Sequence, residues 1–352
     1  MQQAAAMSKY ATYKSELIPP IHGCMNAGNT CWQNACTQLL FSLSAFNEFI
    51  LRRGGDPDIK STYVKLYKKY LEQQLPLAVV NKIRAEEKQK PYIAEINNID
   101  VENISVMLLR EFIAGTTRSD YAIGQQDSPA TGIIDLLESI RCEEVYKYFN
   151  NKYAVTTYCT ICNKPSSRID DRSPFVKMYV DMPIKSQSAM ENWMRLRLEN
   201  ISDFKCESCG AKNITAERRE TLNMLREIIL INYRQPSLTR FFPDRMIFPE
   251  RGGRTLNYKK IGQIEWSGSL DAPSADSSAL ESRRKYSFMS SGHYWATVSR
   301  VDAEGKEKWY TANDGSITPI AEASRNNTVI VAYHLMSVTE MTAEERKYFG
   351  IV

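Results

Sequence analysis

Two Cys-x-x-Cys pairs place the strongest constraint on what this chain can fold into. The pairs are Cys159 with Cys162 and Cys206 with Cys209, and 43 residues lie between them. Two short thiolate knuckles make a closed tetrahedral site, which suits a structural zinc ion rather than a catalytic metal. We therefore predict one Zn²⁺ per chain, holding the tips of two hairpins together. The alternative is that the two pairs are unrelated.

Composition narrows the class of protein. With 352 residues, 43% of them hydrophobic, the chain can form one large enzyme domain or two to three smaller units. The net charge of +4 includes no long basic run, which argues against nucleic acid as the main partner. No signal peptide and no run of 18 apolar residues are recognised, so we expect no membrane partner. Eight cysteines without an export signal favour free thiols and an intracellular protein of the cytoplasm or the nucleus.

Hydrophobic periodicity divides the chain into a helical first half and a strand-rich second half. Helical spacing dominates residues 23–149, with helices expected near 63–71 and 101–108. Another helix is expected to begin at Ser128 and Pro129, because proline is favoured in the first turn.

After residue 152, short segments rich in Val, Thr, Tyr and Ile alternate with turn residues. The clearest predicted strands are 153–158, 175–180 and 228–233. Residues 269–291 are rich in Ser, Asp and Ala and predict a long mobile loop. Together the two halves predict an α+β fold.

Cys31 is the candidate nucleophile. It stands where a turn rich in Gly and Asn, within residues 23–35, gives way to an apolar helical run. Backbone N–H groups and the dipole of a helix N-terminus favour a thiolate at such a position. The alternative is an inert buried thiol, which is the commoner role of a free cysteine.

His293 is the candidate base for this thiol. A thiol protease needs a base to take the thiol proton and a third group to orient that base. The chain has three histidines, and His293 alone follows a glycine at the start of an alternating strand. Asn313 and Asp314 end a later strand, and either could accept the imidazole N–H. The alternative for His293 is a structural histidine, which is also the role we expect for His334.

With these motifs the chain resembles the ubiquitin-specific proteases, a papain-like group of deubiquitinating enzymes. The resemblance runs from about residue 23 to residue 335, with the motifs in the family's order. The first motif is matched by Gly23, Asn26, Gly28, Asn29, Thr30, Cys31, Asn34 and Ala35. The second is matched by Gly292, His293, Tyr294 and residues 309–314, and a third by Gln125, Gln126, Asp127 and Ser128.

The resemblance implies a role for each matched residue. Cys31 would be the nucleophile, His293 the general base and Asn313 the residue that orients His293. Asp314 would help to polarise the site. Asn26 would donate its amide to the oxyanion, and the loss of one such donor typically lowers the rate about 10²–10³-fold.

Four further residues are implied to contact the substrate: Gln126, Asp127, Gly292 and Tyr294. The carboxylate of Asp127 could pair with arginines in the basic tail of ubiquitin. The alternative for Asp127 and Ser128 is an ordinary helix start.

The same resemblance implies the domain organisation. We expect a papain-like α+β fold in which a helical thumb and a sheet-rich palm accompany fingers pinned by zinc. The expected segments are a lead at 1–20, one catalytic domain at 21–340, and a tail at 341–352. Within the domain we expect the thumb at about 21–149, the fingers at about 150–225, the palm at about 165–185 and 226–340, and an expanded loop at 269–291.

The implied activity is that of a cysteine-type ubiquitinyl hydrolase, which cleaves the bond after the C-terminal glycine of ubiquitin. Its partners would be ubiquitin and ubiquitinated proteins, and we expect a monomer that uses no cofactor for catalysis. One alternative is an isopeptidase for another ubiquitin-like modifier, and another is a weakly catalytic adaptor that binds ubiquitin. The chain departs from the family at Trp32, where Tyr is usual, at Trp266, where His is common, and at Gln235 and Pro236.

Overall fold

The computed structural model divides the chain into two compact units. The first comprises Met1–Val145, Tyr233–Leu238 and Ile261–Val331, and the second comprises Tyr146–Asn232, Thr239–Lys260 and Ala332–Val352. The structure describes residues 23–24, 26, 28–53, 63–64, 66–67, 70, 78, 81–82, 85, 128–140, 142–170, 175–178, 186, 196–233, 242–250, 253–268, 292–301, 306–323 and 327–348.

Four helices lie in the first half of the chain, where helical spacing predicts them: α2 (Cys31–Phe41), α3 (Ser44–Arg53), α7 (Pro129–Ser139) and α8 (Glu143–Phe149). A further helix, α11 (Ala343–Tyr348), follows the strands. The predicted start of a helix at Ser128 and Pro129 is confirmed. Pro129 is its first residue, and the Ser128 side chain accepts a hydrogen bond from the backbone N–H of Ala130. The helix expected near 101–108 lies outside the described residues.

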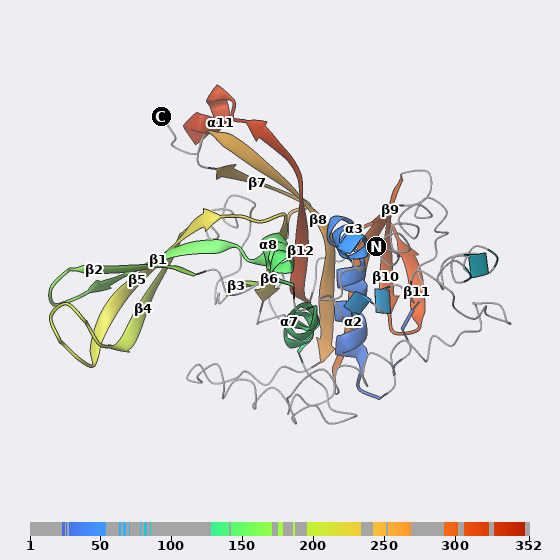
Figure 1. Ribbon diagram of the computed structural model, residues 1–352, viewed down its shortest axis with the longest axis horizontal. Helices are drawn as coiled ribbons and strands as arrows, with labels where there is room; N and C mark the ends of the chain where they lie inside the picture. The colour runs from blue at the N-terminus through green and yellow to red at the C-terminus, as the bar shows by residue number, and fades with distance from the viewer. Residues whose placement is uncertain are drawn as a thin grey trace. The chain divides into compact units, whose positions relative to one another are not determined.

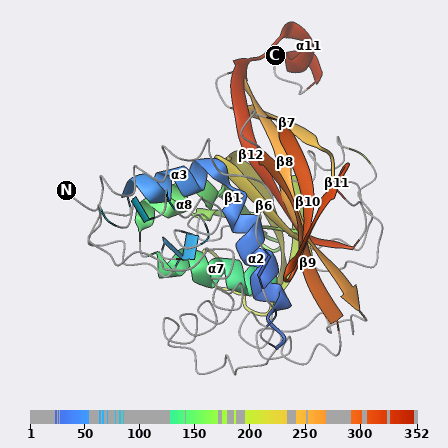
Figure 2. The same cartoon turned by 90° about the vertical axis from the view of Figure 1, so that its right-hand side faces the viewer.

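Helix α2 forms the centre of the first unit. All 11 of its residues are buried, polar ones included. The helix lies against β9 (Gly292–Val301) and β10 (Glu307–Asn313) on one side and against α7 on another (Figure 2). A helix covered on all sides is held rigidly by its neighbours.

The sheet of the first unit is antiparallel. It contains β11 (Ser316–Ile320), β10, β9 and the C-terminal half of β8 (Arg254–Gly268), in that order. In β8 and β9, Ile264 lies opposite Ala296, and Gly268 lies opposite Gly292. A two-residue turn joins β10 to β11, since Asn313 pairs with Ser316.

The second unit contains a separate four-stranded antiparallel sheet. Its order is β2 (Pro165–Asp170), β1 (Lys152–Cys159), β5 (Ile214–Met224) and β4 (Leu196–Phe204), and Figure 1 shows its long strands in green and yellow. The strand predicted at 153–158 is confirmed as β1.

Two of the remaining strands of the second unit pair with β8, and two more follow in the strand order. They are β7 (Arg245–Glu250), β12 (Thr328–Glu340), whose first four residues belong to the first unit, β6 (Ile228–Tyr233) and β3 (Phe175–Met178). The strand predicted at 228–233 is confirmed, and the one predicted at 175–180 is described over its first four residues. Among the helices that the structure describes, none combines the length and the apolar character needed to cross a bilayer.

Candidate active site

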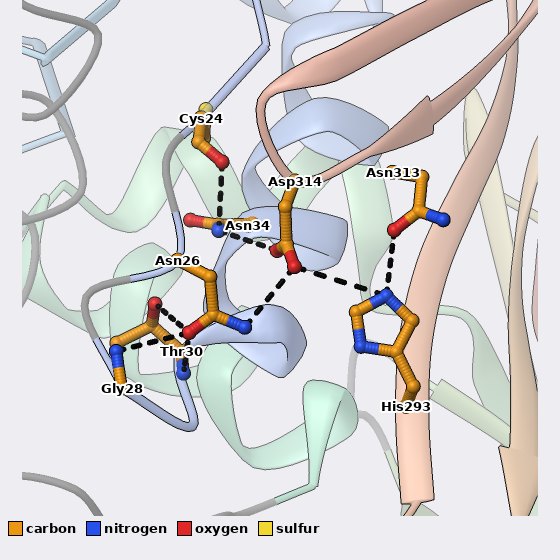
Figure 3. A network of polar contacts seen from close by, with 8 residues as sticks. All are labelled: Cys24, Asn26, Gly28, Thr30, Asn34, His293, Asn313 and Asp314. Carbon is orange, nitrogen blue, oxygen red and sulfur yellow. Dashed lines mark hydrogen bonds and ion pairs between the residues drawn. The ribbon is translucent and has the colours of Figure 1, made fainter.

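Cys31 is the first residue of α2, as the sequence predicts. The turn before it is built by Asn26, whose Oδ1 accepts hydrogen bonds from the backbone N–H of Gly28 at 3.0 Å and of Thr30 at 3.1 Å (Figure 3). Gly28 and Asn29 have φ values of 97° and 55°, a region that Gly and Asn adopt more readily than other residues. The sequence of the turn therefore fixes where the helix begins and where the thiol lies.

The electrostatics of Cys31 oppose ionisation. Its side chain is only 3% exposed, and this burial raises the pKa of the thiol above the usual 9.0. The backbone N–H of Tyr294 lowers the pKa, Asp314 raises it, and the N–H groups of Trp32 and Cys31 itself lower it. The helix start thus favours the thiolate as expected, but burial outweighs it. In this state the thiol needs a base to ionise at neutral pH.

Two other cysteines of the first unit behave as packing residues. Burial raises the pKa of Cys24 to about 12, and it also raises the pKa of Cys36 far above the usual value. Both are fully buried. Neither is a competing nucleophile.

His293 lies on β9 and is oriented by the end of β10. Its Nε2 is 2.6 Å from Asn313 Oδ1 and 3.8 Å from Asp314 Oδ2 (Figure 3). Two oxygen atoms that face Nε2 favour the tautomer with the proton on that nitrogen. Nδ1 is then the nitrogen that can accept a proton. Because Tyr294 N–H contacts the Cys31 thiol, the residue next to His293 lies at the sulfur.

Asp314 is the centre of the polar network. Its Oδ1 accepts a hydrogen bond from Asn34 Nδ2 at 2.8 Å, and its Oδ2 accepts one from Asn26 Nδ2 at 3.0 Å. The same Oδ2 is the oxygen that faces His293. The carboxylate therefore contacts residues of the turn, the helix and the strand, as Figure 3 shows.

The turn between β10 and β11 is bound closely to the segment before Cys31. Asp314 has a φ of 47°, and its backbone C=O accepts a hydrogen bond from Cys24 N–H at 2.8 Å. A Cβ atom at Gly23 would lie 2.4 Å from the backbone carbon of Gly315, which is too close for any side chain. Glycine at 23 is therefore required for the contact that brings Asp314 to α2.

Two of the predicted substrate contacts lie beside Trp266. A Cβ atom at Gly292 would lie 1.9 Å from Cζ2 of Trp266, and the rings of Tyr294 and Trp266 are 4.3 Å apart. The indole therefore occupies the space beside Gly292. The other two predicted contacts, Gln126 and Asp127, and the loop at 269–291 lie outside the described residues.

The structure thus brings together five predicted site residues in the first unit: Asn26, Cys31, His293, Asn313 and Asp314. It also reveals one contact that the sequence did not predict, the bond from Asn34 to Asp314. Asn34 was matched as part of a motif, but a bond between residues 280 positions apart leaves no signal in local spacing.

The four cysteines of the two pairs meet in the second unit. Their sulfur atoms all lie within 4.8 Å of one another, and Cys159 to Cys209 and Cys162 to Cys206 are each 3.8 Å. Four sulfurs bound tetrahedrally to one zinc at about 2.3 Å lie about 3.8 Å apart. The donor set and its dimensions therefore fit Zn²⁺.

The thiols of this cluster do not ionise equally without a cation. Hydrogen bonds from the backbone, first that of Cys162, lower the pKa of Cys159 to about 7. The pKa of Cys209 is raised to about 11: the Ala211 backbone lowers it, but desolvation and the neighbouring thiols raise it. Four neighbouring thiolates thus require a positive charge among them.

The chain is similar to known proteins both in sequence and in fold. The sequence matches the family described as ubiquitin carboxyl-terminal hydrolase over residues 22–343. One similar solved structure is the SAGA DUB module of Ubp8, Sgf11, Sus1 and Sgf73 bound to monoubiquitin, with 15% identity and a TM-score of 0.60. The same module bound to ubiquitin aldehyde has 14% sequence identity and a TM-score of 0.62. Yeast SAGA DUBm with a mutant Sgf73 has 13% identity and a TM-score of 0.54.

Each of these similarities covers 95% of this chain and 75% of the other. At identities this low, the similarity shows a shared fold. No curated protein matched the chain.

Proposed function

Because the chain belongs to the ubiquitin carboxyl-terminal hydrolase family, with the α+β papain-like fold and deubiquitinating activity that this entails, we propose that Cys31 is its nucleophile and His293 its general base. The observation that carries the proposal is the 2.6 Å contact between His293 Nε2 and Asn313 Oδ1. That contact orients an imidazole in the same unit as a thiol at a helix N-terminus, beside the residue whose N–H bonds the thiol.

In the proposed reaction, Nδ1 of His293 takes the proton of the Cys31 thiol. The thiolate attacks the carbonyl carbon of the C-terminal glycine of ubiquitin in an isopeptide or peptide bond. The imidazolium then gives its proton to the leaving amine as the C–N bond breaks, which leaves a thioester. A water molecule, deprotonated by the same Nδ1, hydrolyses the thioester and regenerates the thiol.

Asn26 is proposed to stabilise the tetrahedral intermediate. Its Nδ2 carries two hydrogens, and the bond to Asp314 uses one of them. The second hydrogen, together with the backbone N–H of Cys31, would donate to the oxyanion. Such donors act most strongly on charge that develops only in the transition state.

We propose that Asn313 and Asp314 together orient His293. Asn313 accepts the closer contact on Nε2, and Asp314 stabilises the imidazolium through its charge at 3.8 Å. Gly292 and Tyr294, with Gln126 and Asp127, are kept as proposed contacts to the ubiquitin tail.

We also propose that Cys159, Cys162, Cys206 and Cys209 bind one Zn²⁺ in a structural role. With four thiolate ligands a zinc site has no open position, so it would join two loops and take no part in the reaction. We further propose that the chain is divided into thumb, fingers and palm, that it is a monomer, and that it is located in the cytoplasm or the nucleus. The solved relatives are parts of multi-subunit modules.

The test uses a fluorogenic ubiquitin conjugate and the full chain. The wild type should hydrolyse it, and Cys31→Ala should lower kcat/KM about 10⁴-fold or more. Cys36→Ala is the matched control, because Cys36 is a buried thiol on the same helix. Turnover that survives Cys31→Ala would disprove the assignment. Binding of ubiquitin without turnover would indicate the adaptor, and faster turnover of another conjugated modifier would indicate the other isopeptidase.

A further inference from the structure

Asn34 has no part in the reaction proposed above, yet it bonds a carboxylate that the reaction uses. The residue lies three positions after Cys31 on α2, nearly one helical turn away, and is 2% exposed. Its Nδ2 donates to Asp314 Oδ1 at 2.8 Å and to the backbone C=O of Cys24 at 3.0 Å (Figure 3). The side chain is thus buried between the turn and the hairpin that form the site.

The two oxygens of Asp314 have different partners. Oδ1 is bonded to Asn34, while Oδ2 is bonded to Asn26 and faces His293. A carboxylate that accepts an amide hydrogen on each oxygen cannot rotate without breaking one of these bonds. The bond at Oδ1 therefore fixes the direction of Oδ2.

The backbone of the same residues closes a ring around this carboxylate. Cys24 N–H donates to the C=O of Asp314, and the C=O of Cys24 accepts from Asn34, whose amide also holds the Asp314 side chain. Both the main chain and the side chain of Asp314 are therefore fixed by contacts to residues 24 and 34.

We infer that Asn34 is a positioning residue, which holds the Asp314 carboxylate so that one oxygen serves the Asn26 amide and the His293 imidazole together. The inference rests on the proposed function, in which Asn26 and His293 act on the substrate and the thiol. Asn34 acts in this inference through its bond to Asp314.

The charge of Asp314 gives this positioning a second effect. Asp314 is one of the groups that raise the pKa of the Cys31 thiol, so an unscreened carboxylate at this place opposes the thiolate. Amide hydrogens on both oxygens disperse the negative charge. Asn34 therefore allows an acid to stabilise the imidazolium with less penalty to the nucleophile.

The first experiment compares steady-state kinetics on the ubiquitin conjugate. Asn34→Ala should lower kcat about ten-fold to a hundred-fold, the usual range for a lost hydrogen bond to a charged group, with KM changed less than about two-fold. If Asn34→Ala does not fold, Asn34→Leu is measured in its place, since leucine has a similar shape to asparagine but no donor. A kcat equal to that of the wild type would overturn the inference.

Asn47→Ala is the matched control for burial and stability. Asn47 is also a buried asparagine of the first unit, 1% exposed, and its Nδ2 likewise donates to a backbone C=O, that of Leu40, at 2.9 Å. Asn47→Ala should lower the melting temperature and leave kcat unchanged. An equal fall in kcat for both variants would show that Asn34 is only structural.

A double-mutant cycle with Asp314→Ala gives the decisive readout. If Asn34 acts through Asp314, adding Asn34→Ala to Asp314→Ala should change kcat by less than about two-fold. Losses that multiply would overturn the inference, because they would mean independent roles. Failure of the proposed function is seen separately, as a wild type that does not turn over the conjugate.

Discussion

The two functional regions of this chain are held together in opposite ways. In the first unit, whose central helix is wholly buried, the carboxylate of Asp314 contacts residues 26, 34 and 293, which lie up to 288 positions from it in sequence. In the four-stranded sheet of the second unit, the four thiols come from two local knuckles, and much of the surface is exposed. The active site therefore depends on many distant polar contacts, whereas the sheet depends on one cluster.

Burial explains the difference. Leu196 is 48% exposed and Ile169 is 53% exposed, and both lie on one face of the sheet, because the register aligns Leu196 with Thr221, Ala154 and Ile169. Leu198, 63% exposed, lies on the same face. An antiparallel sheet with an exposed apolar face gains little from a hydrophobic core. Such a sheet needs another source of stability, and four zinc-bound thiolates would supply it.

The largest expected effect is a loss of activity, without a loss of stability, when His293 in the first unit is replaced. His293→Ala should lower kcat/KM on the ubiquitin conjugate about 10⁴-fold, because the thiol loses its base, while the melting temperature changes little. His334→Ala is the control, since His334 contacts Glu227 at 3.3 Å in the second unit and has no role in the reaction. A loss within about ten-fold for His293→Ala would mean that another group is the base.

A smaller effect, on structure, is expected from the second region. Cys162→Ser should reduce bound zinc from about one per chain to nearly none and speed amide hydrogen exchange in β1 and β5 about ten-fold or more. Cys142→Ser, a free thiol outside the cluster, should change neither. Unchanged exchange after loss of the metal would show that the sheet is stable without it and does not depend on the cluster.

The smallest effect concerns the reactivity of Cys31 without substrate. At pH 7 a thiol with a pKa of 9.0 is about one per cent thiolate, and burial makes the share at Cys31 smaller. Alkylation of Cys31 by iodoacetamide should therefore be slow at neutral pH and keep rising beyond pH 9. The rate is obtained by subtracting the labelling of Cys31→Ala, because Cys209 is exposed. A plateau below pH 7 would instead mean that a thiolate–imidazolium pair exists in the free enzyme.

Local sequence signals predicted the elements of both regions. The Gly and Asn turn predicted the helix start at Cys31, and Ser128 and Pro129 predicted the start of α7. Segments rich in Val, Thr, Tyr and Ile predicted β1 and β6. The doubled cysteine pairs predicted that four thiols would meet, and they do. In each of these cases the residues that determine the element are neighbours in sequence, or are cysteines, which need further ligands to complete a metal site.

What the sequence could not predict depends on packing between distant segments. The dipole of a helix start suggested a thiolate at Cys31, but burial by the surrounding fold raises the pKa of the thiol more than the N–H groups lower it. The bond from Asn34 to Asp314 joins the two sides of the site, and its two residues give no sign of each other locally. Gln126 and Asp127, by contrast, lie where the structure describes no residues, so their contacts with substrate stay predictions.

The close contact of Gly23 with Gly315 has a consequence for the synthesis of the protein. The proposed nucleophile leaves the ribosome before its proposed base, the orienting amide and the turn at Asp314, which are translated more than two hundred and fifty codons later. In a nascent chain Cys31 therefore lacks its proposed base, and cleavage can begin only after the hairpin at Asp314 has packed against the segment at Gly23.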